Sequence, residues 1–300
     1  MLPRRSPTRR PARFARLAVV AALLGLATLG GAAQAAAEDD APSSWALPTS
    51  GNLLSAFNRN SYNEQDGAPQ QVDDPRSPGR PALMFSLDGG DQRSELQPRT
   101  PYLREGNVVY YSYRAYLDPD FPTDVNTWQL ILQWHQEGDS GSPPVAVEVR
   151  NNRLQLVLTG DDYQDLGPVS GGQTVDLILR IAFSQDPDKG TVDVWNGGRH
   201  VLNAFHPASG TLIDDSAYEK VGLYRDRSID QPARLYLEDL RIGPAMSSVR
   251  ATDAPALSEG PAPAATTSAG TSGSPLFWTA LVLVGVVLAV ALLRPWARRP

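Results

Sequence analysis

The sequence predicts an all-β protein, a β-sandwich or jelly roll, on three observations. Apolar and polar residues alternate with a period of two in many short runs, which is typical of strands with one buried face. Turn-forming residues separate these runs, and the chain contains 25 Gly and 26 Pro. Outside the two ends, no long stretch has the 3.6-residue period of a helix. An apolar content of 41% is that of a globular protein rather than of a disordered one.

The predicted strands are short and are joined by recognisable turns. Asn151-Asn152 and Gly197-Gly198 each fit a two-residue hairpin turn. About 200 residues lie between the two ends, which suits one domain. Sheets of such sandwiches are often curved, and a concave polar face can hold an extended polymer. In chain order, the predicted strands are residues 82–88, 92–98, 108–118, 127–136, 144–150, 153–159, 174–184, 190–195, 199–203, 219–225 and 233–242.

The first 37 residues are predicted to be a secretory signal peptide. Six arginines precede an apolar run, and Ala33-Gln34-Ala35 fits a cleavage site, with Ala37 as an alternative end. Arg9-Arg10 resembles the twin-arginine signal, but the residues that follow fit it poorly, so general secretion is preferred. An uncleaved anchor is disfavoured because the apolar run is short.

The C-terminal end is predicted to be a membrane anchor. Residues 276–293 contain no charge, can span a bilayer as one helix, and precede a basic tail, residues 294–300, expected in the cytoplasm. Residues 246–275 are an Ala/Pro/Thr/Ser-rich linker, and residues 38–51 a disordered N-terminal segment. The folded domain is expected at 52–245. The prediction is an exported protein whose extracellular domain is anchored by a single transmembrane helix.

The charge of the domain excludes several classes of function. Nine of the 27 basic residues lie in the two ends, which contain no acidic residue, so the middle carries 18 basic against 33 acidic residues, a net charge of −15. A nucleic-acid binder normally has a basic face, so nucleic acid is not expected as a partner. The absence of cysteine excludes disulfides, Cys-ligated zinc and a thiol nucleophile.

Three predicted strands place polar side chains on a common face. In residues 128–135 the even positions, from Trp128 to Trp134, form a core face, so Gln133 and His135 point the other way. Arg93, Glu95 and Gln97 share one face of residues 93–97, and Tyr218, Lys220, Gly222 and Tyr224 share one face of residues 218–225. Each strand alone is also compatible with an ordinary solvated surface. Gly222 indicates close approach of a ligand or of another chain.

This set of residues fits β-elimination from a uronic acid better than hydrolysis. No carboxylate pair of the kind used by glycoside hydrolases stands out in these strands. In elimination, amide and guanidinium donors neutralise the substrate carboxylate and stabilise the enolate-like charge that develops. A base then removes the C5 proton, and an acid protonates the departing O4. Histidine suits the base near neutral pH, and tyrosine suits the acid or both roles.

The same segments resemble the jelly-roll polysaccharide lyases, which include alginate lyases, glucuronan lyases and the heparin lyase I group. The resemblance covers residues 53–243 and implies a concanavalin-like jelly roll with a concave substrate groove. It implies that Gln133 and Arg93 neutralise the carboxylate. His135 would take the C5 proton or leave both proton transfers to Tyr224, depending on the C5 epimer. The motifs are Arg93-Ser94-Glu95-Leu96, Gln133-Trp134-His135 and Tyr218-Glu219-Lys220-Val221-Gly222-Leu223-Tyr224-Arg225.

The resemblance also implies how the polymer is held. Lys220 and Tyr218 would hold neighbouring sugars, Glu95 would orient Arg93, and Gln97 and Arg225 complete the expected substrate contacts. The alginate lyase pattern has a basic residue where this chain has Gln97 and an aromatic where it has Glu219. Together with the acidic domain, these differences favour a less charged anionic polysaccharide, such as a glucuronan, over alginate or heparin. His200 and His206 are interpreted as structural.

No cofactor is expected to be required, and a structural calcium ion is left open without an assigned site. Asp161-Asp162, Asp186-Asp188 and Asp214-Asp215 are acidic, but no EF-hand spacing is present. A monomer is expected.

The alternative function is a non-catalytic glycan-binding module of the same fold, and a third is an adhesin or cell-wall structural protein. His135 and Tyr224 discriminate among these alternatives, because only a lyase needs them for proton transfer.

Overall fold

The computed structural model describes residues 43–62, 67–137, 141–159, 162–250 and 256–258. The predicted signal peptide, membrane helix and basic tail lie outside these ranges. Among the described residues, no helix has both the length and the hydropathy needed to cross a bilayer.

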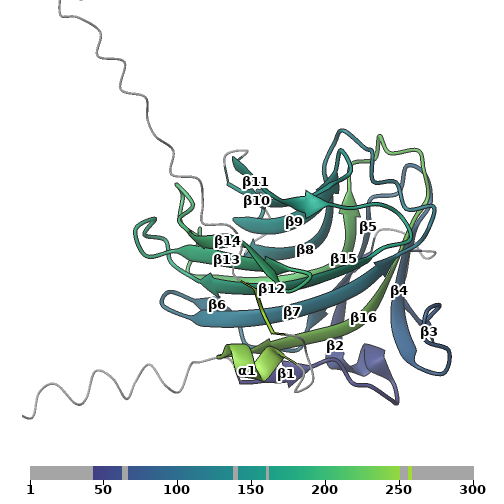
Figure 1. Cartoon of the computed structure of the whole chain (residues 1–300), viewed down its shortest axis with the longest axis horizontal. Helices are drawn as coiled ribbons and strands as arrows, with labels where there is room; N and C mark the ends of the chain where they lie inside the picture. Colours follow the sequence, from purple (N-terminus) through teal and green to yellow (C-terminus); the bar gives the residue numbers. More distant parts are fainter. Residues whose placement is uncertain (1–42, 63–66, 138–140, 160–161, 251–255, 259–300) are drawn as a thin grey trace, which may run out of the picture. The chain divides into compact units, whose positions relative to one another are not determined.

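The domain is a sandwich of two antiparallel sheets with eight strands each (Figure 1). Sheet A has the order β14-β13-β12-β7-β16-β4-β3, with β1 paired to β16. Sheet B has the order β11-β10-β9-β8-β15-β5-β2, with β6 paired to β15. Sheet A contains β1 (Trp45–Ala46), β3 (Gln70–Asp73), β4 (Pro81–Leu87), β7 (Val108–Leu117), β12 (Thr174–Ala182), β13 (Thr191–Asn196), β14 (Arg199–Phe205) and β16 (Ala233–Gly243). Sheet B contains β2 (Phe57–Tyr62), β5 (Arg93–Pro98), β6 (Leu103–Arg104), β8 (Gln129–Gln136), β9 (Val145–Arg150), β10 (Arg153–Leu158), β11 (Asp162–Pro168) and β15 (Ser216–Arg225).

All eleven predicted strands are present, and the predicted hairpin turns are confirmed. Asn151 and Asn152 connect β9 to β10 with φ of 51° and 59°, as a type I′ turn requires. Gly197 and Gly198 connect β13 to β14 with φ of 55° and 81°. The all-β sandwich therefore follows from the alternation and the turn residues.

The structure adds strands that alternation did not reveal, and it corrects the domain boundaries. Residues 45–46 pair with β16 and Leu47 lies in the core, so the segment predicted as disordered is folded there. Residues 70–73, which lie outside every predicted strand, form an edge strand beside β4. Beyond β16, α1 (Met246–Val249) buries Val249, and Ser258 pairs with Arg199, so part of the predicted linker packs on the domain. Strands β1 and β3, of two and four residues, are too short for a periodic signal. Strands β2 and β11, of six and seven residues, are also absent from the predicted set.

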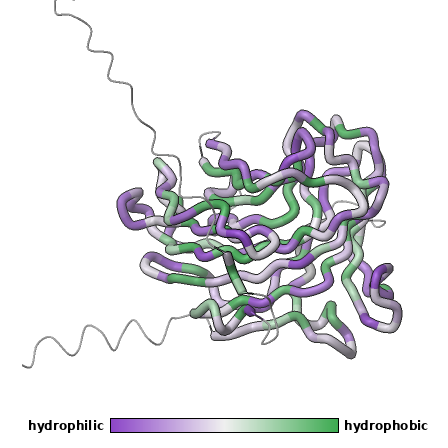
Figure 2. Tube along the Cα trace, in the orientation of Figure 1, coloured by the Kyte–Doolittle hydropathy of each residue, from purple (hydrophilic) through white to green (hydrophobic). Residues whose placement is uncertain are grey.

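One hydrophobic core lies between the two sheets. It is built from the alternate residues of β4, β7, β12 and β16 in sheet A and of β8, β9 and β15 in sheet B. Figure 2 shows the hydrophobic stretches that run along these strands. Tyr111 of β7 meets Trp134 of β8 edge to face, with ring centroids 4.9 Å apart. Trp134 therefore occupies the core, as predicted.

Gly222 is required by a close approach of two strands rather than by a ligand. It has a φ of 132°, and a Cβ there would lie 2.3 Å from the carbonyl oxygen of Ser94 on β5. It would also lie 2.6 Å from the Phe85 ring. The close approach predicted at this glycine is thus that of β5 and β4 to β15.

Replacing Gly222 by alanine should destabilise the domain by about 3 kcal/mol or more, because it combines a strained φ with a backbone clash. A matched control is Gly198→Ala, where φ is 81° but no atom lies within 4 Å of the added Cβ. Thermal unfolding of both variants checks this prediction. An equal loss of Tm in both would show that the clash does not contribute.

The buried carboxyl of Glu219 should make stability depend on pH. Glu219 is 1% exposed and accepts a hydrogen bond from the Thr100 hydroxyl. Burial raises its pKa from 4.5 to about 7. The folded state therefore favours the protonated form, so the contribution of Glu219 to stability is most favourable below pH 4.5 and is lost as pH rises through about 7.

Glu219→Gln keeps the acceptor for Thr100 but removes the charge. At pH 8 the variant should be more stable than the wild type by about 2–3 kcal/mol, and at pH 4.5 the two should be equal. Denaturant unfolding at both pH values measures this difference. A gain of the same size at both pH values would contradict the assignment to the Glu219 charge.

Candidate active site

Three adjacent strands of sheet B bring the predicted site residues together. In the order β8-β15-β5, Gln133 lies opposite Lys220, His135 opposite Tyr218, and Tyr224 opposite Arg93. The neighbours of these residues along the strands, Leu132, Trp134, Leu223 and Leu96, lie in the core. The site therefore lies on the face of sheet B that points away from the core, as the three patterns predict. A concave groove on this face stays a prediction.

The site has a buried layer of polar side chains. Glu95, Gln133 and Lys220 are 2%, 0% and 6% exposed. The Gln133 amide nitrogen donates to Glu95 Oε1, whereas Gln133 Oε1 has no hydrogen-bond partner within the described part of the chain. Glu95 Oε2 lies 3.4 Å from Arg93 Nε, as expected if Glu95 orients Arg93. Gln133 is thus placed beneath the surface of the site rather than on it.

Glu95 is poised between two charge states near neutral pH. Burial raises its pKa from 4.5 to about 7, although Lys220, the Gln133 hydrogen bond and Arg93 each lower it. When Glu95 is protonated, it no longer offsets the positive charges of Lys220 and Arg93. A bound carboxylate then becomes their natural counter-ion.

The outer layer of the site contains the partly exposed Arg93, Tyr224, His135 and Tyr218. The Arg93 guanidinium carbon lies 3.9 Å from the centre of the Tyr224 ring, in a cation–π contact. On the same ring, Trp128 packs edge to face with centroids 4.7 Å apart. These contacts fix the phenol next to the cation that would hold a substrate carboxylate.

His135 has the tautomer and charge expected of a general base. Its Nδ1 lies 2.8 Å from the Gln136 carbonyl oxygen, which can only accept, so in the neutral ring Nδ1 carries the proton and Nε2 the lone pair. Burial lowers its pKa from 6.5, and Lys220 and Arg93 lower it further, whereas the carbonyls of Gln136 and Gly141 oppose this shift. The imidazole is therefore neutral at pH 7.

Tyr218 and Lys220 lie at the His135 end of the site, where the resemblance places neighbouring sugars. The Tyr218 ring is 5.9 Å from the His135 ring and 5.3 Å from Lys220 Nζ. Tyr102, which the sequence analysis missed, packs edge to face on Tyr218 at 5.7 Å and is 42% exposed. Its position in a short loop between β5 and β6 gives no periodic signal.

Two predicted substrate contacts are placed differently. Arg225 is fully buried, and its guanidinium donates to the carbonyl oxygens of Asp91, Gln231 and Asp88. It therefore braces loops instead of facing a polymer, because alternation puts it on the side of β15 opposite to Tyr224. Gln97 lies farther along β5, opposite Asn58, and is 7% exposed.

Trp128 was predicted on the core face, and this prediction is wrong. A β-bulge in β8 pairs Leu130 with Glu148 but Leu132 with Val147, so one residue of β8 is extra. Ile131 and Leu132 both enter the core, whereas Trp128 contacts Tyr224 on the site face. The uninterrupted Trp-x-Leu-x-Leu-x-Trp alternation gives no sign of the bulge.

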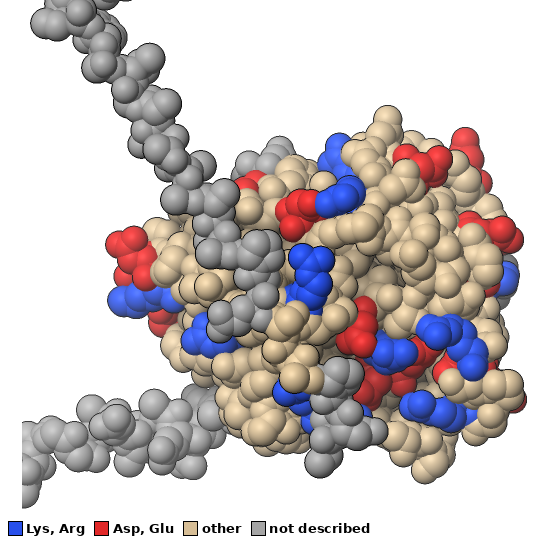
Figure 3. All heavy atoms as spheres, in the orientation of Figure 1, with Lys and Arg blue, Asp and Glu red and all other residues tan. Residues whose placement is uncertain are grey.

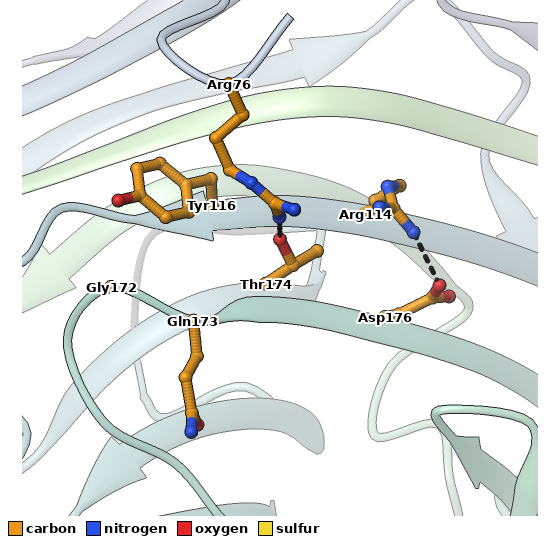
Figure 4. Close-up of a pocket in the computed structure, with 7 residues that line it drawn as sticks. All are labelled: Arg76, Arg114, Tyr116, Gly172, Gln173, Thr174 and Asp176. Carbon is orange, nitrogen blue, oxygen red and sulfur yellow. Dashed lines mark hydrogen bonds and ion pairs between the residues drawn. The ribbon is translucent and has the colours of Figure 1, made fainter.

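The described surface also contains a pocket on the other sheet, which differs from this site. The pocket in Figure 4 lies on sheet A, where Arg114 is neutralised by Asp176 at 2.8 Å and by Glu238 at 2.9 Å.

Within the described ranges, no group of three or more His, Asp or Glu side chains is arranged to hold a metal ion. Basic and acidic side chains are intermixed on the face seen in Figure 3. His200 pairs with Asp193 and stacks on Trp195, and His206 Nδ1 lies 3.0 Å from the Pro187 carbonyl oxygen.

A family model and several solved structures match the domain. A family model described as polysaccharide lyase matches residues 50–241. Among solved structures, an endo-β-1,4-glucuronan lyase from the fungus Trichoderma reesei has 18% identity and a TM-score of 0.54, covering 68% of this chain and 97% of that one. An alginate lyase of polysaccharide lyase family 7 has 16% identity and a TM-score of 0.43, with 65% and 87% covered. The family 7 alginate lyase AlyA1 from Zobellia galactanivorans has 14% identity and a TM-score of 0.42, with 60% and 81% covered.

No significant sequence match was found among curated proteins. The glucuronan lyase similarity shows a shared fold. The heparin lyase I part of the predicted resemblance is not supported by these comparisons.

Proposed function

Because the chain belongs to the polysaccharide lyase family, we propose that it cleaves a uronic-acid-containing polysaccharide by β-elimination. The observation that carries this proposal is the arrangement of Arg93, Tyr224 and His135 on one face of sheet B. A cation for the carboxylate, a phenol for O4 and a neutral imidazole are the groups that elimination needs. All three are partly exposed on this face. The Arg93 guanidinium contacts the Tyr224 ring, and its positive charge also lowers the pKa of His135.

In the proposed mechanism, Arg93 binds the uronate carboxylate and makes the C5 proton more acidic. As the C5–H bond breaks, the electron pair forms a C4–C5 double bond and the C4–O4 bond breaks. Tyr224 protonates the departing O4. Gln133 and Lys220 lie beneath Arg93 and add donors and positive charge as the enolate-like charge develops. No hydrolytic water and no second carboxylate are required.

The identity of the base follows from the sugar ring. In a glucuronate, the C5 hydrogen and O4 lie on the same face of the ring, so Tyr224 can serve as base and then as acid. In the C5 epimer they lie on opposite faces, and His135 Nε2 is the group on the other side. For a glucuronate polymer we therefore assign both proton transfers to Tyr224, with His135 as a supporting contact.

This assignment gives a prediction for His135→Gln, which keeps a polar side chain but removes the base. On glucuronan the variant should lose less than about tenfold in kcat, whereas loss of a true general base costs about 10²–10⁴-fold. Initial rates with glucuronan and with a polymer of the C5 epimer provide the measurement. A loss of the larger size on glucuronan would assign the base to His135 instead.

We propose a glucuronate polymer of moderate charge as the substrate. Gln97 replaces a basic residue of the alginate lyase pattern, and the part of the chain between the two basic ends carries a net charge of −15. Both features disfavour a densely charged chain such as heparin. Glu219, which replaces an aromatic of that pattern, does not bear on this choice because its carboxyl is buried between the sheets. The similarity in fold to a glucuronan lyase supports the same substrate.

The proposed location rests on the sequence of the two ends. Residues 1–37 would direct export, and residues 276–293 would hold the protein in the membrane with the lyase domain outside. Membrane fractionation followed by protease treatment of intact cells tests this proposal. Protection of the domain from protease would place it inside instead.

A panel of polymers tests the substrate. The protein is incubated with glucuronan, alginate, heparin, hyaluronan and pectate, and the ultraviolet absorbance of the new conjugated double bond is followed. We expect the largest rise with glucuronan. No rise with any polymer, together with saturable binding to one of them, would favour the glycan-binding module.

A further inference from the structure

We propose that Trp128 is a positioning residue that holds the Tyr224 phenol in place for proton transfer. This inference rests on the proposed lyase function and concerns the same site. It assigns a role to a residue whose sequence pattern indicates a core position.

The Tyr224 ring is held by two different groups. Arg93 lies over the ring with its guanidinium carbon 3.9 Å from the centre. Trp128 contacts it with centroids 4.7 Å apart and an interplanar angle of 60°. An edge-to-face contact of this kind restricts the tilt of a ring, which a single cation–π contact leaves free. With both contacts made, the direction of the phenolic oxygen is defined.

The backbone brings Trp128 to this position through two irregularities of sheet B. The bulge in β8 turns Trp128 to the site face. Between β8 and β15 the register shifts, so that Leu132 pairs with Val221 but Leu130 pairs with Tyr224. Both irregularities lie beside Tyr224, and together they place a tryptophan next to it. Bulges that re-aim a side chain are frequent beside active sites.

Trp128 is itself fixed by Asp226, the second residue after Tyr224. The Asp226 backbone amide donates to the Trp128 carbonyl oxygen at 3.1 Å. Thr127 Oγ1 also donates to Asp226 Oδ2 at 2.9 Å. These contacts, with those from Ser228 as the largest, lower the pKa of Asp226, so the carboxylate stays an acceptor. The backbone of Trp128 is thus anchored to the segment that follows β15.

A double-mutant cycle on the full-length protein separates positioning from direct sugar binding. Trp128→Leu and Trp128→Phe are made in the wild type and in Tyr224→Phe, and kcat and KM are measured with glucuronan. In the wild type, Trp128→Leu should lower kcat by about tenfold or more, with little change in KM, because the phenol is misplaced. Trp128→Phe should recover most of the rate, since it keeps an aromatic edge.

In the Tyr224→Phe background, Trp128→Leu should cause no further loss, because the group it positions is already absent. Losses that multiply, or a rise in KM alone, would show that Trp128 binds sugar directly and would overturn the proposal. Asp226→Asn is the second variant, in case Trp128→Leu does not fold. It should lower kcat in the wild type and have no effect with Tyr224→Phe, and multiplying losses would overturn the proposal in the same way.

The two proposals fail in different ways. If the wild-type protein produces no unsaturated uronate from any polymer, the lyase function is wrong. If the wild type is active and Tyr224→Phe is not, but the Trp128 losses multiply with the loss from Tyr224→Phe, only the positioning role is wrong.

Discussion

Replacing Tyr224 by phenylalanine should lower kcat on the uronate polymer by about 10²–10⁴-fold, the usual contribution of a general acid or base. The phenolic oxygen is the only atom removed, so the ring contacts with Arg93 and Trp128 are kept. The loss therefore reports proton transfer rather than packing. Rates of double-bond formation at saturating polymer measure it.

The chain offers a matched control for this substitution on sheet A. Tyr116 lies beneath the guanidinium of Arg76, 5.4 Å from ring centre to carbon, in a pair similar to Tyr224 and Arg93 (Figure 4). Tyr116→Phe should leave kcat unchanged. A Tyr224→Phe variant that keeps full activity, with an unchanged Tm, would remove Tyr224 from the mechanism.

Replacing Arg93 by alanine should have the second-largest effect, a loss of about 10²–10³-fold in kcat, comparable to the loss of an oxyanion-hole donor. The substitution removes three interactions of the Arg93 guanidinium. The substrate carboxylate loses its cation, the Tyr224 ring loses one of its two contacts, and Glu95 loses its ion-pair partner. Negative charge develops next to Arg93 as the C5 proton leaves, so the interaction with Arg93 is stronger in the transition state than in the bound substrate. The loss should therefore appear in kcat more than in KM.

Arg93→Lys separates charge from shape, since lysine keeps the positive charge but lacks the planar fork. It should recover part of the rate. Arg76→Ala, which removes the corresponding cation on sheet A, should have no effect. An Arg93→Ala variant that raises KM alone would show that Arg93 binds the polymer without taking part in the chemistry.

Strand alternation predicted the fold and most of the site because it is a local property. The faces of β5 and β15 follow from which residues are apolar, and so Arg93, Glu95, Lys220 and Tyr224 were placed on the correct side. The resemblance to the jelly-roll polysaccharide lyases then grouped the three motifs into one predicted site. That β8, β15 and β5 are neighbours in one sheet is a property of topology and could not be read from any single strand.

The misplaced residues have specific physical causes. Trp128 was assigned to the core because a bulge reverses the alternation without changing the sequence pattern. Arg225 was assigned to the polymer by the resemblance, although alternation puts it on the side of β15 opposite to Tyr224. There its guanidinium donates to three backbone carbonyls. The burial of Gln133 follows from its pairing with Glu95 on another strand, which single-strand reasoning does not include.

The most direct test of the lyase assignment counts two products of the same reaction. The protein is incubated with glucuronan, and new reducing ends and new conjugated double bonds are measured in the same samples. Elimination creates one double bond for each reducing end, so the two should rise together in a one-to-one ratio. Reducing ends without double bonds would identify a hydrolase and contradict the proposed mechanism.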